Sequence, residues 1–409
     1  MKKTLWTRNF TLVTLASALG AMGGIAGGFA LAFLVFDETG STLASALVIA
    51  MNVIPGFLLP LVAAPWMDRL PRKPVLVAGD VINGLLYGLA GLYLLRFRFS
   101  YLGYLLFSLL LSSLDCLDSL AYKGIYPMLI PLGQEERGYT VAGMLYPVLK
   151  VLMTPVAAVL YDAIGVGWIL VIQAGFSLLA ALTESRIQVR EESRMEGRRA
   201  SLAMWWQDVK EAARYLKEER GLQSIYGYMA VTNGVAAGYS PLLVAFFRTA
   251  PGLTTAMYSL FSVAEFLGRS LGGLLHYHVE IPEKKKFSLA FWVYQIYETM
   301  DMCLLWLPYP LMLVNRGICG FLGINSATMR QAAVQQYIPE RLRARVNAFE
   351  DMVLFAATGL LSLGVGALGE LLDYRLCVTL AAGVTLAVCL GTIWKNRREV
   401  RAVYETKRS

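Results

Sequence analysis

Apolar residues in this chain fall in blocks of about 20 residues, separated by short polar or charged segments. A helix of this length crosses the hydrocarbon core of a bilayer, about 30 Å thick, at about 1.5 Å per residue. Each block must be helical, because lipid cannot hydrogen-bond an open backbone. The pattern predicts an all-α polytopic membrane protein with twelve spans, at residues 9–36, 42–66, 75–95, 101–126, 139–161, 165–183, 222–247, 254–277, 287–306, 309–329, 346–371 and 376–394.

The longest polar stretch divides the spans six and six. It predicts an N-terminal six-helix bundle (1–183), a cytoplasmic linker (184–221), a C-terminal six-helix bundle (222–394) and a cytoplasmic tail (395–409). Within the linker, Ser201 is a candidate N-cap, and apolar residues follow at spacings of three and four. These residues are Leu202, Trp205, Val209, Ala213 and Leu216. We expect an amphipathic helix on the cytoplasmic membrane surface, with tethering favoured over a regulatory or partner-binding role.

Basic residues lie at the N-terminus, after the even-numbered spans and in the tail, whereas the alternate loops hold few. This distribution predicts that both termini are cytoplasmic. The chain is 56% hydrophobic and 16% charged, with a net charge of +8, which we interpret as a topology signal and not as a nucleic-acid footprint. The first apolar run is too long for a secretory signal. All five cysteines fall within spans, and their spacing predicts neither a metal site nor a disulfide framework.

The two predicted halves resemble each other in sequence. The segment IPLGQEERGYTVAGM follows the fourth span, and IPERLRARVNAFEDM follows the tenth. Pro131 therefore corresponds to Pro339, and Arg137 to Arg345. Weak similarity between six-helix halves is typical of duplicated transporters, whose substrate site lies between the halves near the middle of the membrane.

The loop after the second span, AAPWMDRLPRKPVL, resembles the G-x-L-x-D-R-x-G-R-K loop of the major facilitator superfamily. Ala64 and Pro71 stand where that family usually has glycines. The segments FDETGSTLASAL and VAGD, with the two I-P…R segments, are similar to the branch that contains macrolide-type efflux proteins and siderophore exporters. The resemblance covers essentially the whole chain and implies the major facilitator fold, two six-helix pseudo-repeats and alternating access.

The same resemblance implies a cytoplasmic latch, in which carboxylates and guanidinium groups pair in one conformation and separate in the other. The alternative is that these charges only set the topology. The residues concerned are Asp68, Arg69, Arg72, Lys73 and Asp80, with Glu350 and Asp351 as partners from the opposite half.

The fourth span places charged residues inside an apolar segment, where each ion costs several kcal/mol if it faces lipid. Asp115 shares one helical stripe with Tyr122, and Asp118 and Lys123 flank that stripe on opposite sides. The fifth span offers Tyr146 and Lys150 on one face. We predict an ion pair between Asp115 and Lys150, with Asp118 as a proton-binding group close to it. The alternative is a static buried salt bridge.

The second half carries its own charged residues within spans. Glu265 and Arg269 are spaced i, i+4 and can pair along one helix. We interpret Glu298 and Asp301 as inter-helix struts, that is, side chains that hold neighbouring helices together, or, less favoured, as a proton relay. Arg316 either lines a cavity or ties two helices together. Further hydrogen-bonding groups suited to a cavity are Asn52, Tyr228, Asn233 and Tyr239, although each is more often an inter-helix hydrogen bond.

The chain has no phosphate-binding G-x-x-x-x-G-K-[ST] loop, and its spans show no nucleophile–base pair. We therefore predict no enzyme and no cofactor. We expect a monomeric secondary transporter of the bacterial cytoplasmic membrane that exports amphipathic small molecules in exchange for protons or, less favoured, sodium. The alternatives are export of an anionic metabolite, siderophore or lipid, and a non-transporting receptor on a transporter fold.

Overall fold

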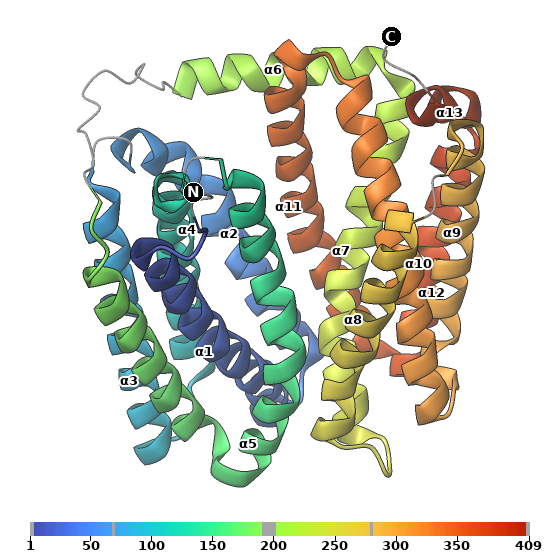
Figure 1. Cartoon of the computed structure of the whole chain (residues 1–409). Helices are drawn as coiled ribbons and strands as arrows, with labels where there is room; N and C mark the ends of the chain where they lie inside the picture. The colour runs from blue at the N-terminus through green and yellow to red at the C-terminus, as the bar shows by residue number, and fades with distance from the viewer. Residues whose placement is uncertain (1–3, 68–69, 132, 190–201, 279–280, 406–409) are drawn as a thin grey trace. The chain divides into compact units, whose positions relative to one another are not determined.

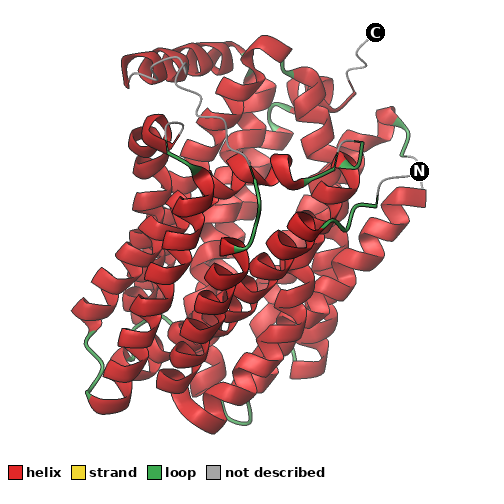
Figure 2. Ribbon diagram, turned by 60° about the vertical axis from the view of Figure 1, so that its left-hand side comes forward, coloured by secondary structure: helices red, strands yellow, loops and turns green. Residues whose placement is uncertain are grey.

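The computed structural model of the chain describes residues 4–67, 70–131, 133–189, 202–278 and 281–405. Over these ranges the chain consists of helices joined by short loops, with no strand (Figure 2). The helices of the first half are α1 (Arg8–Thr39), α2 (Thr42–Met67), α3 (Arg72–Arg96), α4 (Tyr101–Leu129) and α5 (Glu135–Ser185). Those of the second half are α6 (Leu202–Glu218), α7 (Arg220–Thr249), α8 (Thr255–His278), α9 (Glu283–Cys303), α10 (Tyr309–Tyr337), α11 (Glu340–Leu371), α12 (Tyr374–Cys389) and α13 (Arg397–Glu405).

Helix α5 contains two of the predicted spans. Gly165, with φ of 77° and ψ of 170°, interrupts its helical backbone where the sequence predicts the short connection between spans five and six. A left-handed φ of this kind is open to glycine at little steric cost. Figure 1 shows the two parts of α5 running in opposite directions from this turn. All twelve predicted spans are therefore helical in the structure.

The chain divides into two compact units. The first unit comprises Met1–Gly40 and Met51–Ala200, and the second comprises Ser41–Ala50 and Ser201–Ser409. The start of α2 thus belongs to the second unit, where it packs on α11. Glu370 of α11 accepts hydrogen bonds from the Ser41 hydroxyl at 2.8 Å and from the Leu43 amide at 2.9 Å. A carboxylate at the first turn of a helix satisfies amides that have no partner inside the helix.

Large apolar side chains cover the outer faces of the helices. On α3, for example, Leu85, Leu89 and Leu92 are exposed. Polar and charged side chains such as Gln173, Glu298 and Asp301 are instead buried. This distribution is the reverse of a soluble protein's and is that of a protein embedded in lipid.

Seven helices of the described residues are long and apolar enough to cross a membrane: α1, α3, α4, α5, α7, α11 and α12. Helices α8, α9 and α10 fall outside that set, and they carry charged residues in the middle of their predicted spans. Charged side chains lower the mean hydropathy of a segment, so these three helices are where a functional cavity is expected.

Helix α6 forms where the sequence predicts an amphipathic helix. Ala212 and Leu216 on this helix are buried in a core cluster of the second unit, and Glu211 forms an ion pair of 2.5 Å with Arg345 of α11. Helix α6 therefore packs against the protein in addition to presenting exposed residues such as Trp206. The predicted N-cap, Ser201, lies outside the described residues.

Close backbone packing of α8 against α10 leads to a first prediction. A methyl group on Gly268 would overlap the carbonyl oxygen of Gly317 in α10, whereas one on Gly273 would meet nothing within 4 Å. We expect Gly268→Ala to lower the free energy of unfolding by about 1–3 kcal/mol, because the helices must separate. Gly273→Ala, on the same helix, is the matched control. Thermal unfolding in detergent checks the pair, and equal stability of both variants would contradict this packing.

Candidate functional site

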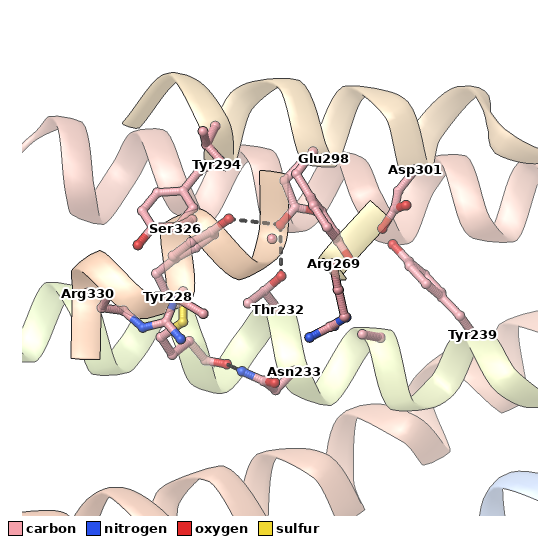
Figure 3. A pocket seen from close by; sticks show the side chains of 16 residues that line it. Tyr228, Thr232, Asn233, Tyr239, Arg269, Tyr294, Glu298, Asp301, Ser326 and Arg330 are labelled. Carbon is pink, nitrogen blue, oxygen red and sulfur yellow. Dashed lines mark hydrogen bonds between the residues drawn. The ribbon is translucent and has the colours of Figure 1, made fainter. Parts of the chain in front are cut away.

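The second unit contains a partly open cavity of about 270 Å³ between α7, α8, α9 and α10 (Figure 3). Its wall combines tyrosines and small apolar residues with two acidic and two basic side chains. The lining residues are Tyr228, Met229, Thr232, Asn233, Ala236, Tyr239, Arg269, Val293, Tyr294, Tyr297, Glu298, Asp301, Gly323, Ser326, Ala327 and Arg330. Small-molecule sites usually place a few convergent polar groups in an apolar cavity. This cavity has such convergent groups, and its wall is about as polar as it is apolar.

Glu298 is the most completely bonded polar group of this wall. Its side chain is only 2% exposed. Oε1 accepts hydrogen bonds from the Tyr228 hydroxyl at 2.9 Å and from the Thr232 hydroxyl at 2.8 Å, both on α7. Oε2 lies 2.5 Å from the hydroxyl oxygen of Thr385 on α12. Figure 3 shows the two bonds from α7 converging on the carboxylate. The sequence analysis favoured a structural role for Glu298 between helices. In the structure its hydrogen bonds join α9 to α7 and α12, and its side chain also lines the cavity.

The hydroxyl of Thr385 has two neighbours but only one hydrogen. Its oxygen lies 2.5 Å from Glu298 and 2.7 Å from the carbonyl oxygen of Ala382. When Glu298 is ionised, Thr385 donates to the carboxylate. When Glu298 is protonated, Glu298 donates to Thr385, and Thr385 donates to the carbonyl. The site therefore accommodates both protonation states of Glu298 without moving a heavy atom.

Asp301 and Arg316 form a buried ion pair one helical turn from Glu298. The Arg316 guanidinium contacts the Asp301 carboxylate and also donates to Asn315 Oδ1 at 3.0 Å. Asn315 in turn donates to the Met300 carbonyl of α9 at 2.8 Å. Of the two roles considered for Arg316, the structure shows the tie between α10 and α9. Asp301 also lines the cavity, so this tie forms part of its wall.

Arg269 and Glu265 pair along α8, as their spacing predicts, with guanidinium-to-carboxylate distances of 2.7 and 2.9 Å. Their side chains are 49% and 38% exposed. Arg269 lines the cavity, and so does Arg330 of α10. The sequence analysis assigned Arg330 only to the cytoplasmic charge pattern. Arg330 directly follows the predicted tenth span, which ends at residue 329, and this position gave no signal that the side chain would face a cavity.

The other polar residues predicted for a cavity in this unit, Tyr228, Asn233 and Tyr239, all line it, but they differ in their hydrogen bonds. Tyr228 and Tyr239 line it, and the Tyr239 hydroxyl is buried with no hydrogen-bond partner among the described residues. Asn233 lines it as well, while donating to the Met229 carbonyl of its own helix at 2.7 Å. Thr232 and Thr385, which complete the Glu298 site, were missed, since threonines in apolar spans usually bond their own helix.

In the first unit, the predicted ion pair between Asp115 and Lys150 is wrong. The Asp115 carboxylate lies beside the Asn83 amide of α3, and Lys150 is exposed on α5 with no ion-pair partner among the described residues. The prediction assumed that α4 and α5 pack as a hairpin. Instead α4 packs mainly on α3 and α1, so its carboxylates face α3. Lys123 is also exposed.

Asn52 forms inter-helix hydrogen bonds, accepting from Ser108 at 2.6 Å and from Ser112 at 2.7 Å, both on α4. Tyr122 lies 3.5 Å from the Ser17 hydroxyl of α1 and stacks on Tyr126. Tyr146 is exposed. The sequence analysis gave inter-helix bonding as the commoner role for groups such as Asn52, and this role is observed.

The residues of the expected latch are partly described. Asp68 and Arg69 lie outside the described residues. Arg72 donates to the Gly124 carbonyl of α4 at 2.8 Å, and Lys73 is half-buried at the start of α3. Glu350 interacts electrostatically with Arg330 within the second unit, and Asp351 is exposed. Pairing of these groups across the two halves stays a prediction.

Comparison with known proteins identifies the fold. No protein-family model and no curated protein matches the chain. The structure of the nucleoside transporter NupG has a TM-score of 0.73 and 12% identity, over 95% of this chain and 99% of NupG. The peptide transporter POT bound to alafosfalin has a TM-score of 0.72 and 10% identity, over 99% and 98% of the two chains. A bacterial homolog of the human lysosomal transporter Spinster has a TM-score of 0.62 and 14% identity, over 97% and 93%.

These likenesses extend over nearly the whole length of each chain. Together with the helices described above, they show that the protein is an all-α polytopic membrane protein with the major facilitator fold, twelve transmembrane helices in two six-helix pseudo-repeats. The sequence-based prediction of this fold is confirmed.

Proposed function

We propose that the protein is a secondary active transporter that exports amphipathic small molecules across the bacterial cytoplasmic membrane in exchange for protons. The fold is shared with transporters of nucleosides and peptides. Transport is favoured over catalysis because the cavity wall offers hydrogen bonds, ion pairs and aromatic faces to a ligand, with its carboxylates engaged by hydroxyl groups or by an arginine. The basic residues beside the even-numbered spans support cytoplasmic termini.

One observation carries the proposal of proton coupling. Glu298 is buried in the cavity wall, and its hydrogen-bonded hydroxyl groups fit both the ionised and the protonated side chain. A proton on Glu298 changes the charge of the cavity by one unit. The charge on Glu298 costs less free energy when the cavity is open to water than when it is closed. Gain or loss of the proton can therefore shift the equilibrium between conformations.

The composition of the cavity supports an amphipathic substrate. Tyr228, Tyr239, Tyr294 and Tyr297 supply aromatic surface with polar ends, and Met229 adds an adaptable apolar side chain. The proposal places the apolar body of the substrate against these side chains. Similarity to the efflux branch in the sequence motifs supports export as the direction.

A second candidate is the export of an anionic metabolite, siderophore or lipid. Arg269 and Arg330 both line the cavity, and two guanidinium groups around one cavity are suited to a carboxylate or phosphate. The two candidates differ in the charge of the substrate, and this difference decides the experiment.

The test uses the full-length protein in proteoliposomes with an imposed pH gradient. Flux of ethidium, a cationic amphiphile, and of 8-anilinonaphthalene sulfonate, an anionic one, is compared with and without a protonophore. Protonophore-sensitive ethidium flux supports the first proposal, and preferential flux of the anion supports the second. Flux that follows a sodium gradient would contradict proton coupling. Binding of either dye without flux favours a non-transporting receptor and would overturn transport.

A further inference from the structure

Three carboxyl groups from three helices meet inside the first unit. Asp80 comes from α3, Asp118 from α4 and Glu184 from the last turn of α5. They are close enough for Glu184 to interact electrostatically with both aspartates, and for the two aspartates to interact with each other. Helices α3 and α4 approach closely here. A Cβ atom added to Gly79 would lie only 3.3 Å from Asp118 Oδ1. We call these three groups the acidic triad.

Two members of the acidic triad, Glu184 and Asp118, each have a buried carboxylate oxygen without a hydrogen-bond partner among the described residues. Glu184 is 6% exposed, and its Oε2 has no hydrogen-bond partner within the described chain. The same is true of Asp118 Oδ1. Native structures satisfy nearly all such atoms, so an unpartnered buried oxygen points to a water molecule, an ion or a proton at that position.

No basic side chain compensates the triad within the part of the chain that the structure describes. The titratable groups that surround it are Asp115 and Tyr122 of α4, both of which interact with its members. At the start of α3, Arg72 donates to the Gly124 carbonyl, and Lys73 makes interactions of its own. Lys123 of α4 is exposed and interacts with Cys116 instead. None of the three carboxylates forms an ion pair with a described residue.

Three ionised carboxylates at this site would repel one another in a medium that does not hydrate them. A metal ion or protons can neutralise them. No group of three or more acidic, histidine or cysteine side chains in the described residues converges as metal ligands do. Protons need no convergence of ligands, only a carboxyl oxygen each, so the arrangement favours protons over a metal.

We propose that Glu184, with Asp80 and Asp118, forms a proton-binding site of the N-terminal half, with Glu184 holding a proton in the structure described here. The site is separate from Glu298, which belongs to the other unit. Proton binding at the triad stands without any substrate, and only its use in transport rests on the proposed function. The Tyr122 hydroxyl, which lies between the triad and Ser17 of α1, is the neighbouring group that can exchange a proton with it.

Infrared difference spectroscopy of the purified full-length protein tests proton binding directly, with no substrate present. The carbonyl stretch of a protonated carboxyl group is followed from acid to alkaline pH in H₂O and D₂O. We expect a band near neutral pH that shifts in D₂O and whose Glu184 component is lost in Glu184→Gln. Glu38→Gln, which changes an exposed glutamate of α1, is the matched control and retains the band.

A second variant covers the case in which Glu184→Gln fails to fold. In Asp118→Asn one like charge is removed from the neighbourhood of Glu184, which makes the Glu184 carboxylate easier to form, so the Glu184 band is lost at lower pH than in the parent. A parent spectrum without a protonated carboxyl band, or a band unchanged in both variants, overturns the proposal. Loss of the band on adding sodium chloride, but not potassium chloride, also overturns it in favour of a sodium site.

The outcome is distinguishable from failure of the proposed function. If the parent transports neither dye but shows the band, the proton site stands and transport fails. If Glu184→Gln loses the band but keeps full proton-driven flux, the proton site stands and its use in coupling is removed.

Discussion

Glu298→Gln is expected to abolish proton-driven transport while leaving substrate exchange intact. Glutamine keeps the size of the side chain and can accept from Tyr228 and Thr232, but it cannot gain or lose a proton. The net charge of the cavity is then the same in both conformations. No proton binds at this position, so the pH gradient cannot drive transport through it. Two measurements in proteoliposomes check this result: flux driven by a pH gradient, and exchange of labelled for unlabelled substrate without a gradient.

Matched variants separate proton coupling from packing at this site. Thr385→Val removes the hydroxyl that alternates between Glu298 and the Ala382 carbonyl, and we expect a partial loss of proton-driven flux. Thr299→Val, on an exposed face of α9, is the control and should retain full flux. If Glu298→Gln retained gradient-driven flux equal to that of the parent, the coupling role of Glu298 would be excluded.

The largest loss of stability is expected from Arg316→Met. This substitution leaves the Asp301 carboxylate buried without its cation, which typically costs about 3–5 kcal/mol. The double substitution Arg316→Met with Asp301→Asn removes the uncompensated charge, and we expect it to recover much of that loss. Thermal unfolding in detergent, at matched protein concentration, measures both effects.

Arg269→Met provides the comparison for this second prediction. The Arg269–Glu265 pair is about half exposed, and exposed pairs contribute about 0–1 kcal/mol. The stability of Arg269→Met should therefore lie close to that of the parent. Equal destabilisation by Arg316→Met and Arg269→Met would show that the Asp301–Arg316 pair is not buried as described.

The sequence predicted features that depend on one helix at a time. Hydropathy located every span, and the i, i+4 spacing predicted the Glu265–Arg269 pair, because both follow from the geometry of a single helix. The Asp115–Lys150 pair required knowing which helix packs against α4. Proximity along the chain suggested α5, but α3 and α1 occupy that position. Inter-helix packing is set by the complementary surfaces of the helices, and one-dimensional periodicity does not contain it.

Charged residues inside spans were a correct indicator of the cavity in the second unit, but the role of each depended on its neighbours. Asp301 and Arg316 are 15 residues apart on adjacent helices, and only the structure shows that they pair. Glu184 was missed because it stands at the border of the polar linker, where a glutamate usually faces solvent. Its burial results from the packing of α5 against α1 and α3, which the border position does not reveal.

The reversal of α5 at Gly165 has a practical consequence for mapping topology. Two spans meet there through a single left-handed residue, so this side of the membrane presents almost no loop to an epitope tag, a protease or a thiol-reactive label. A reporter inserted at this point would displace both helix ends. The absence of a reporter signal would then be wrongly interpreted as evidence that the connection is buried. The longer connection at residues 250–254, which contains Gly252, is where an inserted reporter can be accommodated.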